Sequence, residues 1–460
     1  MPKSLSTFLD EISKIPGELI RISRPVKPQA FEATAILEHL HRRDDNSVVL
    51  FEEPENLFGK PSGIQLVSNV FATRERIARA IGHPVDQSRL PLSLEMARCD
   101  NESIPATVCQ GAAPVHEKIF IGEDADVRNL PVVRHYEKDL GPVMTMVVGI
   151  RNPDEGFYEL SFAKTFYKDN PRRMGASLHS LHLARILARY RELGKSAPII
   201  SILGHHPAFN LGVLAATPFG NDDYATIGGF MGESVRLAPS VTFGDEFMVP
   251  ADAEIIVEGE VPPDESEVVD PFGEVTLFYQ AQCIRNAFNV TAITMRNKPI
   301  MQDIFSGHKG HWNLGAIPKE GSIYNSLQTR FGNIVGVHMP HSLCSRLGFY
   351  ISIRKSKEGF AKQVGHAAML ESPFFQFVIV VDEGIDVFDE EKVIWAAASY
   401  TDPSKDVDLI KNSWTIFNTA AGYQKVVIDA TAPLDYPFPE RFKVPDDVMS
   451  SINLEEWINE

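Results

Sequence analysis

The stretch from Val249 to Gln280 constrains the fold more than any other part of the chain. It opens with Ala253–Gly259, a segment dense in β-branched residues that lies between a Pro-Ala-Asp turn and a glycine and predicts a buried strand. Residues 261–267 are polar and predict a loop. The sequence Asp-Pro-Phe-Gly-Glu at 270–274 then predicts a tight turn that places the Glu274 carboxylate beside an aromatic ring. An ordinary surface turn with a solvated glutamate has the same local pattern, so the turn alone does not assign a function.

Length, charge and cysteine spacing limit the class of protein. A chain of 460 residues exceeds what one hydrophobic core supports, so we expect two or three domains. A formal net charge of -17 argues against nucleic acid or an anionic membrane surface as a partner. No apolar run approaches the roughly 20 residues that a bilayer requires, and the start has no signal-peptide core, so we expect a cytoplasmic protein without membrane insertion. Four widely spaced cysteines, Cys99, Cys109, Cys283 and Cys344, are expected to be reduced thiols.

The first 115 residues alternate helical and strand patterns, which indicates an N-terminal α/β domain (1–115). The expected helices lie at 5–12, 33–41 and 73–81, and the expected strands at 19–22 and 47–51. No glycine-rich phosphate loop occurs in this part.

From residue 116 the pattern changes to strands with turn signals, so residues 116–310 are expected to form a barrel-like central domain. The segments 146–151 and 157–166 predict a hairpin, and its second strand alternates large apolar residues with Glu159, Ser161 and Ala163. A cofactor could lie against that small and polar face. Further along, we expect a helix at 172–193, a strand at 199–203 and barrel strands from 235 to about 305.

The remainder of the chain predicts a connecting segment, a second α/β domain and a tail. Residues 307–331 contain His308 and His311 among glycines and are interpreted as a linker or lid that ends in a helix at 324–330. Alternating strands and helices predict a C-terminal α/β domain at 311–432. The tail at 433–460 closes in a short amphipathic helix and is expected to pack on another domain or subunit.

Several blocks, taken in order, resemble the UbiD family of reversible decarboxylases. Besides the strand and the Pro-Phe-Gly-Glu turn described above, the blocks are Leu130-Pro-Val-Val with Asp139-Leu-Gly-Pro, the hairpin at 145–156, Leu203-Gly204 before Pro207-Ala208, the segment at 292–300, Phe377–Asp382 to Ile385-Asp-Val, and Trp395-Ala. The resemblance spans nearly the whole chain. It implies an α/β multidomain (α+β) fold with a central split β-barrel domain that binds prenylated FMN and a C-terminal domain that forms a homodimer or higher oligomer.

The resemblance also implies an activity, in which prenylated FMN supplied by a flavin prenyltransferase removes CO2 from an aromatic or α,β-unsaturated carboxylic acid. Glu274 matches the family's proton donor, and Lys164 occupies the position of a family arginine. Val269 stands where the family has a second glutamate. A second carboxylate near Glu274 would therefore have to come from Asp270 or Glu267. A guanidinium binds a carboxylate through two parallel hydrogen bonds, whereas an ammonium is a point charge, so the orientation of the substrate stays open.

A divalent metal, commonly manganese, holds the cofactor phosphate in the family, and K+ is a further candidate ion. The family's ligand positions fall on Glu159, His179 and Asp223, an oxygen and nitrogen set that suits such a metal. From the residues alone, His179 and His182 are more readily interpreted as solvated or core histidines than as metal ligands.

The resemblance places a larger set of side chains around the cofactor. The set is Ser161, Phe162, Ala163, Lys164, Leu178, His179, Asp223 and Lys425.

Three hypotheses follow. The first is a prenylated-FMN-dependent decarboxylase with Glu274 as proton donor. The second is a catalytically degenerate or partner-dependent subunit, which the residues Lys164 and Val269 favour. The third is a metal-dependent hydrolase that uses Glu159, His179 and Asp223 without flavin.

Overall fold

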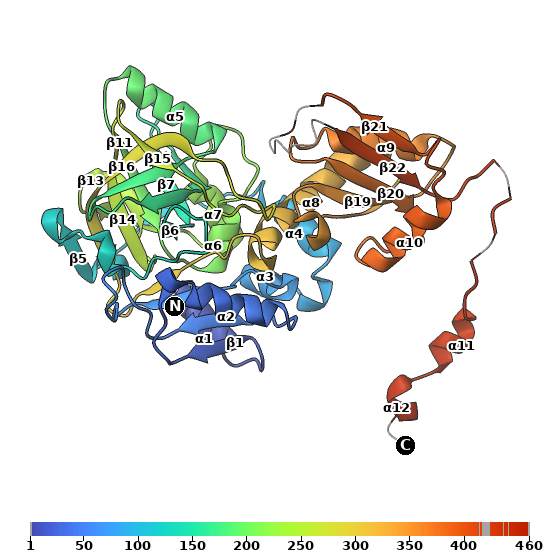
Figure 1. Cartoon of the computed structure of the whole chain (residues 1–460), viewed down its shortest axis with the longest axis horizontal. Coiled ribbons are helices and arrows are strands. Elements are labelled where there is room, and N and C mark those ends of the chain that lie inside the picture. Colours follow the sequence, from blue (N-terminus) through green and yellow to red (C-terminus); the bar gives the residue numbers. More distant parts are fainter. Residues whose placement is uncertain (1, 414, 416–423, 436, 440, 459–460) are drawn as a thin grey trace.

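The computed structural model describes residues 2–413, 415, 424–435, 437–439 and 441–458. Figure 1 shows the N-terminal elements in blue packed against the central elements in green and yellow, with the C-terminal elements in orange forming a second lobe. Each part combines helices with a sheet, which confirms the predicted α/β multidomain fold class. No helix in the described part of the chain is both long enough and apolar enough to span a bilayer.

The N-terminal part is a four-stranded sheet with the order β1-β2-β3-β17. Its elements are α1 (Leu5–Ile12), β1 (Leu19–Ile22), α2 (Glu32–His41), β2 (Val48–Phe51), β3 (Gln65–Ser68), α3 (Arg74–Ile81), α4 (Leu90–Cys99) and β17 (Ile300–Gln302). The Ser4 side chain accepts a hydrogen bond from the Thr7 amide and caps α1, as its position before the apolar residues predicts. The strand β17 returns from the far end of the central domain and pairs in parallel with β3, so the two parts are joined through one sheet.

The central part is a curled sheet with the order β6-β9-β10-β16-β14-β11-β7-β8, in which β5 and β15 also pair with β16. Its strands are β5 (Lys118–Ile121), β6 (Val143–Met144), β7 (Val147–Arg151), β8 (Tyr158–Phe162), β9 (Lys164–Tyr167), β10 (Arg173–Ser177), β11 (Ala197–Ile202), β14 (Ile255–Val261), β15 (Ser266–Val269) and β16 (Cys283–Met295). A smaller sheet contains β4 (Thr107–Val108), β12 (Arg236–Ser240) and β13 (Gly244–Pro250), and the helices are α5 (Leu181–Glu192), α6 (Pro207–Gly212) and α7 (Asp223–Met231). The expected hairpin of β7 and β8 is present, with Gly149 opposite Leu160.

Two central segments differ from the expectation. The helix predicted at 172–193 is strand β10 followed by α5, because Gly175 and its neighbours pair with β9 on one side and β16 on the other. The polar loop predicted at 261–267 is shorter, since Ser266 already begins β15, which pairs with β16. In both cases pairing with a strand distant in sequence outweighs the local pattern.

The segment interpreted as a linker or lid is mostly one long helix, α8 (Lys309–Phe331), which continues through Pro318. A β-carbon on Gly321 would lie 1.9 Å from the Ser93 carbonyl oxygen, so glycine is what allows α8 to approach α4 this closely. The glycines that favoured a linker in the sequence therefore serve helix packing.

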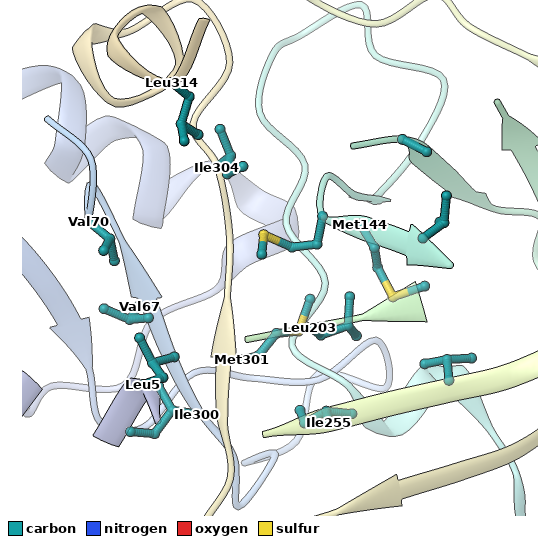
Figure 2. Packing of buried hydrophobic residues seen from close by; sticks show 14 of the residues in the cluster. Leu5, Val67, Val70, Met144, Leu203, Ile255, Ile300, Met301, Ile304 and Leu314 are labelled. Carbon is teal, nitrogen blue, oxygen red and sulfur yellow. The ribbon is translucent and has the colours of Figure 1, made fainter. Parts of the chain in front are cut away.

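The helix α8 belongs to two hydrophobic cores. Figure 2 shows Leu314 next to Ile304, in the core that the N-terminal and central parts share and that also contains Val67 and Met144. Two turns further on, Ile323 and Leu327 pack in the core of the C-terminal part. Because one helix contributes to both cores, it connects the two lobes rigidly.

The C-terminal part is a five-stranded sheet with the order β18-β19-β20-β22-β21. Its elements are β18 (Ile334–His338), β19 (Gly348–Ile353), α9 (Phe360–Met369), β20 (Phe377–Asp382), α10 (Glu390–Tyr400), β21 (Val407–Ile410) and β22 (Lys425–Ala430). The tail carries α11 (Asp446–Ser451) and α12 (Leu454–Ile458), which extend away from the body with Trp457 68% exposed. All four cysteines are free, as expected.

Candidate active site

The predicted catalytic pair is in contact. Lys164 begins β9, directly after the strand break at Ala163, and its ammonium forms an ion pair with the Glu274 carboxylate. The same Nζ lies 4.9 Å from the centre of the Phe272 ring and 3.9 Å from Asp270 Oδ1. The Lys164 and Glu274 side chains are 12% and 21% exposed, so the pair is screened from bulk water but still accessible.

Asp270 supplies the second carboxylate that the sequence left open. Its side chain is fully buried next to Lys164, and burial raises its pKa, with Glu274 adding to the rise and Lys164 opposing it. Val269 instead packs in a small apolar cluster with Phe272, and Glu267 pairs with Arg173. The site therefore contains one ammonium between two carboxylates.

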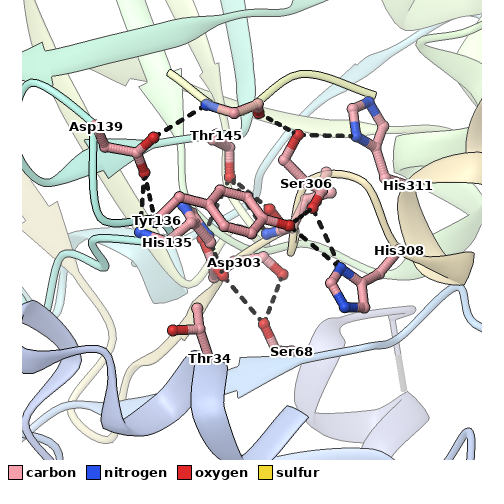
Figure 3. Close-up of polar contacts among 12 residues, drawn as sticks. Thr34, Ser68, His135, Tyr136, Asp139, Thr145, Asp303, Ser306, His308 and His311 are labelled. Atoms are coloured by element: carbon pink, nitrogen blue, oxygen red, sulfur yellow. Dashed lines mark hydrogen bonds and ion pairs between the residues drawn. The ribbon is translucent and has the colours of Figure 1, made fainter. Parts of the chain in front are cut away.

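A network around Gly273 holds the Glu274 turn in place. We call the residues Asp139, Tyr136 and Ser306 the Asp139 network (Figure 3). Asp139 Oδ1 accepts a hydrogen bond from the Gly273 amide at 3.0 Å, and its Oδ2 accepts from the amides of His135 at 3.1 Å and Tyr136 at 2.8 Å. Ser306 Oγ donates to the Gly273 carbonyl oxygen at 2.7 Å, and a β-carbon on Gly273 would lie 2.3 Å from the Tyr136 ring. Both faces of the turn are thus fixed beside Glu274.

Buried polar groups behind this network connect it to the N-terminal sheet. His135 Nε2 lies 3.0 Å from Asp303 Oδ2, and the same carboxylate accepts from Ser68 Oγ on β3 and from Thr145 Oγ1. Burial lowers the pKa of His135, but the Asp303 carboxylate outweighs that effect and the pKa is raised. A buried hydrogen-bonded pair of His135 and Asp303 gives the site a rigid support.

Replacing Asp139 with alanine is expected to loosen the Glu274 turn. The variant leaves three amide donors without their acceptor, and a buried unsatisfied donor costs roughly 1–3 kcal/mol. Hydrogen exchange at the Gly273 and Glu274 amides should accelerate, and the thermal unfolding midpoint should fall. Asp124→Ala, at an exposed position, is the matched control and should change neither quantity. Unchanged exchange at Gly273 in Asp139→Ala would show that the turn does not depend on this network.

The predicted metal ligands Glu159 and Asp223 lie together at the other end of β8. Asp223 begins α7, and its Oδ2 accepts a hydrogen bond from the Leu160 amide at 2.6 Å, which fixes it beside Glu159. Burial raises the pKa of Glu159 to about 7. Burial and the neighbouring Glu159 raise the pKa of Asp223 well above its usual value.

The histidine next to these carboxylates is His182, not His179. His182 Nδ1, on α5, lies 3.1 Å from Glu159 Oε1. His179 Nε2 lies 2.8 Å from Ser177 Oγ instead. Burial lowers the pKa of His179, and the Lys164 ammonium lowers it further. His179 therefore lies on the side of Ser177, which is opposite Lys164 in the sheet, whereas His182 completes the group around Glu159.

The chemistry of this donor set suits a cation. Two buried carboxylates with raised pKa values are a costly arrangement that a divalent ion would relieve. Within the described residues, no three His, Cys, Asp or Glu side chains already converge at metal-binding distances. Binding would therefore require Glu159, His182 and Asp223 to rotate towards a common centre.

The other predicted cofactor residues divide between the two lobes. Ser161 and Phe162 follow Glu159 on β8, Ala163 lies between β8 and β9, and the buried Leu178 directly follows β10. These residues lie in sequence between the two carboxylate groups or next to them. Lys425 is buried on β22 of the C-terminal lobe, apart from the others, and burial lowers its pKa.

Reasoning from the sequence missed the Asp139 network and His182. Asp139 stands in the Asp-Leu-Gly-Pro block, but nothing local indicates that its carboxylate accepts from Gly273. His182 lies three residues after His179, so either histidine fits a helical pattern. Only the positions of β8 and α5 in space distinguish them.

Three family models match the chain in order. They describe 3-octaprenyl-4-hydroxybenzoate carboxy-lyase and cover its N-terminal domain at residues 11–90, its Rift-related domain at 106–309 and its C-terminal domain at 312–430.

Solved structures agree over nearly the full length. An evolved dimeric form of the UbiD-class enzyme HmfF from Pelotomaculum thermopropionicum, in complex with prFMN, is 29% identical, with a TM-score of 0.87 over 99% of this chain and 100% of that chain. HmfF from the same organism in complex with FMN is also 29% identical, with a TM-score of 0.88 over 99% of this chain and 100% of that chain. The open form of vanillic acid decarboxylase from Sedimentibacter hydroxybenzoicus is 25% identical with a TM-score of 0.83 over 99% of this chain and 97% of that chain.

Proposed function

Because this chain belongs to the UbiD family, we propose that it is a carboxy-lyase that uses prenylated FMN to decarboxylate an aromatic or α,β-unsaturated acid reversibly and without net oxidation. The single observation that carries the proposal is the contact between Lys164 and Glu274 beside the buried Asp270. It provides a cation for a substrate carboxylate and an acid for the carbon that loses CO2. The names of similar proteins, an HmfF complex with prFMN and a vanillic acid decarboxylase, support the same reaction class.

The residues around β8 fit the cofactor. Glu159, His182 and Asp223 would hold its phosphate through a divalent ion, for which manganese suits the mixed oxygen and nitrogen donors. Ser161 and Ala163 offer small side chains along the sheet between that end and Lys164. When bound, prenylated FMN supplies the electron-accepting ring system that makes loss of CO2 feasible.

The chain itself would orient the substrate and transfer a proton. The Lys164 ammonium attracts the reacting carboxylate, and Glu274, fixed by the Asp139 network, protonates the carbon from which CO2 has departed. Asp270 Oδ1 lies 3.9 Å from Lys164 Nζ, so a second carboxyl group helps to hold the lysine side chain in position while Glu274 transfers its proton. Glu274 regains its proton from solvent, to which it is 21% exposed.

The test is the spectrum of protein produced together with a flavin prenyltransferase. We expect co-purification of a modified flavin whose near-ultraviolet and visible absorption differs from that of FMN, together with CO2 release from a panel of conjugated acids. Protein made without the prenyltransferase is the control and should release no CO2. A metal-loaded protein that excludes flavin would contradict the proposal and favour the hydrolase hypothesis.

A further inference from the structure

A second cation lies along α8 from the proposed catalytic pair. Arg346 follows β18 in the loop before β19 and belongs to the C-terminal lobe. Its guanidinium fills the space over Gly315 of α8, where a β-carbon would lie 1.4 Å from Nη1. The glycine therefore creates a notch into which the planar group fits, and any larger residue would displace it.

The Arg346 guanidinium has no anionic partner among the described residues. Its hydrogen bond is to the carbonyl oxygen of the adjacent Ser345, from Nη1 at 3.2 Å. Burial lowers its pKa to about 10, and no nearby carboxylate offsets that effect. A partly buried guanidinium without a counterion is costly in a chain whose net charge is -17, and a ligand carboxylate is its natural bidentate partner.

Side chains on one face of α8 extend from the Glu274 turn to Arg346. His311, Gly315 and Lys319 recur at four-residue spacing and share one face of α8. His311 Nδ1 lies 3.3 Å from Ser306 Oγ, which donates to the Gly273 carbonyl oxygen, so this face begins at the Asp139 network. Lys319 lies over the Phe374 ring further along.

His311 links the Asp139 network to the Gly315 notch, since it contacts Ser306 and lies one helical turn before Gly315. Its pKa is lowered to about 3 by burial, then by Arg346 and by Lys164, so both cations act on it electrostatically. Arg346 lies over Gly315, one helical turn further along α8 than His311. Arg346 is thus a separate position, beyond His311 from the site where CO2 would be lost.

We propose that Arg346 binds a second carboxylate of the substrate, distal to the one that is lost, so that the preferred substrates are dicarboxylic acids. The inference rests on the proposed function for the identity of the reacting end. It assigns Arg346 a role in specificity, with the Gly315 notch holding the guanidinium in position. The cofactor phosphate is not the partner, because the carboxylates proposed to hold its metal lie at the opposite end of β8.

The test compares acids that differ by one carboxylate. Calorimetric titration of the protein, with and without FMN, would use terephthalate against benzoate and trans,trans-muconate against sorbate. We expect each dicarboxylate to bind at least about tenfold more tightly than its partner, the gain typical of one charge-assisted bidentate contact. Arg346→Gln should abolish this preference while benzoate and sorbate keep their affinity within about twofold.

Two further variants keep the test decisive. Arg354→Gln removes an exposed arginine that directly follows β19 and pairs with Glu383, and it should retain the preference. Arg346→Lys keeps the charge without the fork and should retain part of it. An absent preference in the parent, or an equal loss for both acids of a pair in Arg346→Gln, would overturn the assignment. Failure of the protein to bind FMN would contradict the proposed function. It would leave the test of Arg346 intact, because the titrations without FMN measure the dicarboxylate preference independently.

Discussion

Glu274→Gln is expected to slow deuterium incorporation from solvent at the reacting carbon by roughly 100- to 10,000-fold, the usual contribution of a positioned general acid. Glutamine preserves the size of the side chain and the turn, but it cannot release a carboxylic proton. The measurement is mass spectrometry of product formed in D2O from an acid that the parent decarboxylates. Flavin content is determined in each variant, so that loss of cofactor is not mistaken for loss of the acid.

Two companion variants identify the source of the proton. Lys164→Arg retains the positive charge beside Glu274 and should reduce the rate less than Glu274→Gln does. Asp270→Asn removes the second carboxylate next to Lys164 and also leaves Glu274 in place. If Glu274→Gln incorporated deuterium as fast as the parent while Asp270→Asn did not, the proton would come from Asp270 and the role given to Glu274 would be wrong.

His182→Ala is expected to lose divalent metal and flavin together. His182 Nδ1 lies 3.1 Å from Glu159 Oε1, so it is the imidazole placed to complete a site with Glu159 and Asp223. Metal affinity should fall by at least about 10- to 100-fold, the loss that even outer-shell changes produce. Flavin should follow, because a cofactor phosphate would otherwise face two uncompensated carboxylates. Elemental analysis for manganese and flavin absorbance measure the two losses.

His179→Ala is the matched control, since it removes an imidazole only three residues away that contacts Ser177. It should keep both metal and flavin. The reverse result, in which His179→Ala loses metal and His182→Ala retains it, would restore the ligand assignment that the family resemblance implies. Full flavin occupancy in metal-free His182→Ala would show that the metal does not hold the phosphate.

Much of the fold could be predicted where neighbours in sequence decide the structure. Ser4 before Leu5–Ile12, the turn at 152–156 and the alternation along 158–162 each specify an element through local capping, turn chemistry or periodicity. Local patterns indicated the turn that carries Glu274, whereas its pairing with Lys164 was implied only by the family resemblance.

Two predictions were wrong in part for one physical reason. Residues 173–177 of the helix predicted at 172–193 form a strand, and residues 309–323 of the linker or lid predicted at 307–331 are helical. Both segments contain residues whose local preferences are weak, and contacts with distant parts of the chain decide their structure. Strand β10 exists because two other strands pair with it, and α8 is continuous because Ser93 of α4 approaches Gly321.

The sequence by itself determined the residue types at the site, while the tertiary structure decided which of them meet. A carboxylate at 274 and a lysine at 164 are legible in the chain, and so is a pair of histidines at 179 and 182. Only the packed arrangement selects His182 for Glu159, brings Asp270 to Lys164 and seats Arg346 over Gly315. Those contacts join residues far apart in sequence, so their geometry depends on how strands and helices pack rather than on any local pattern.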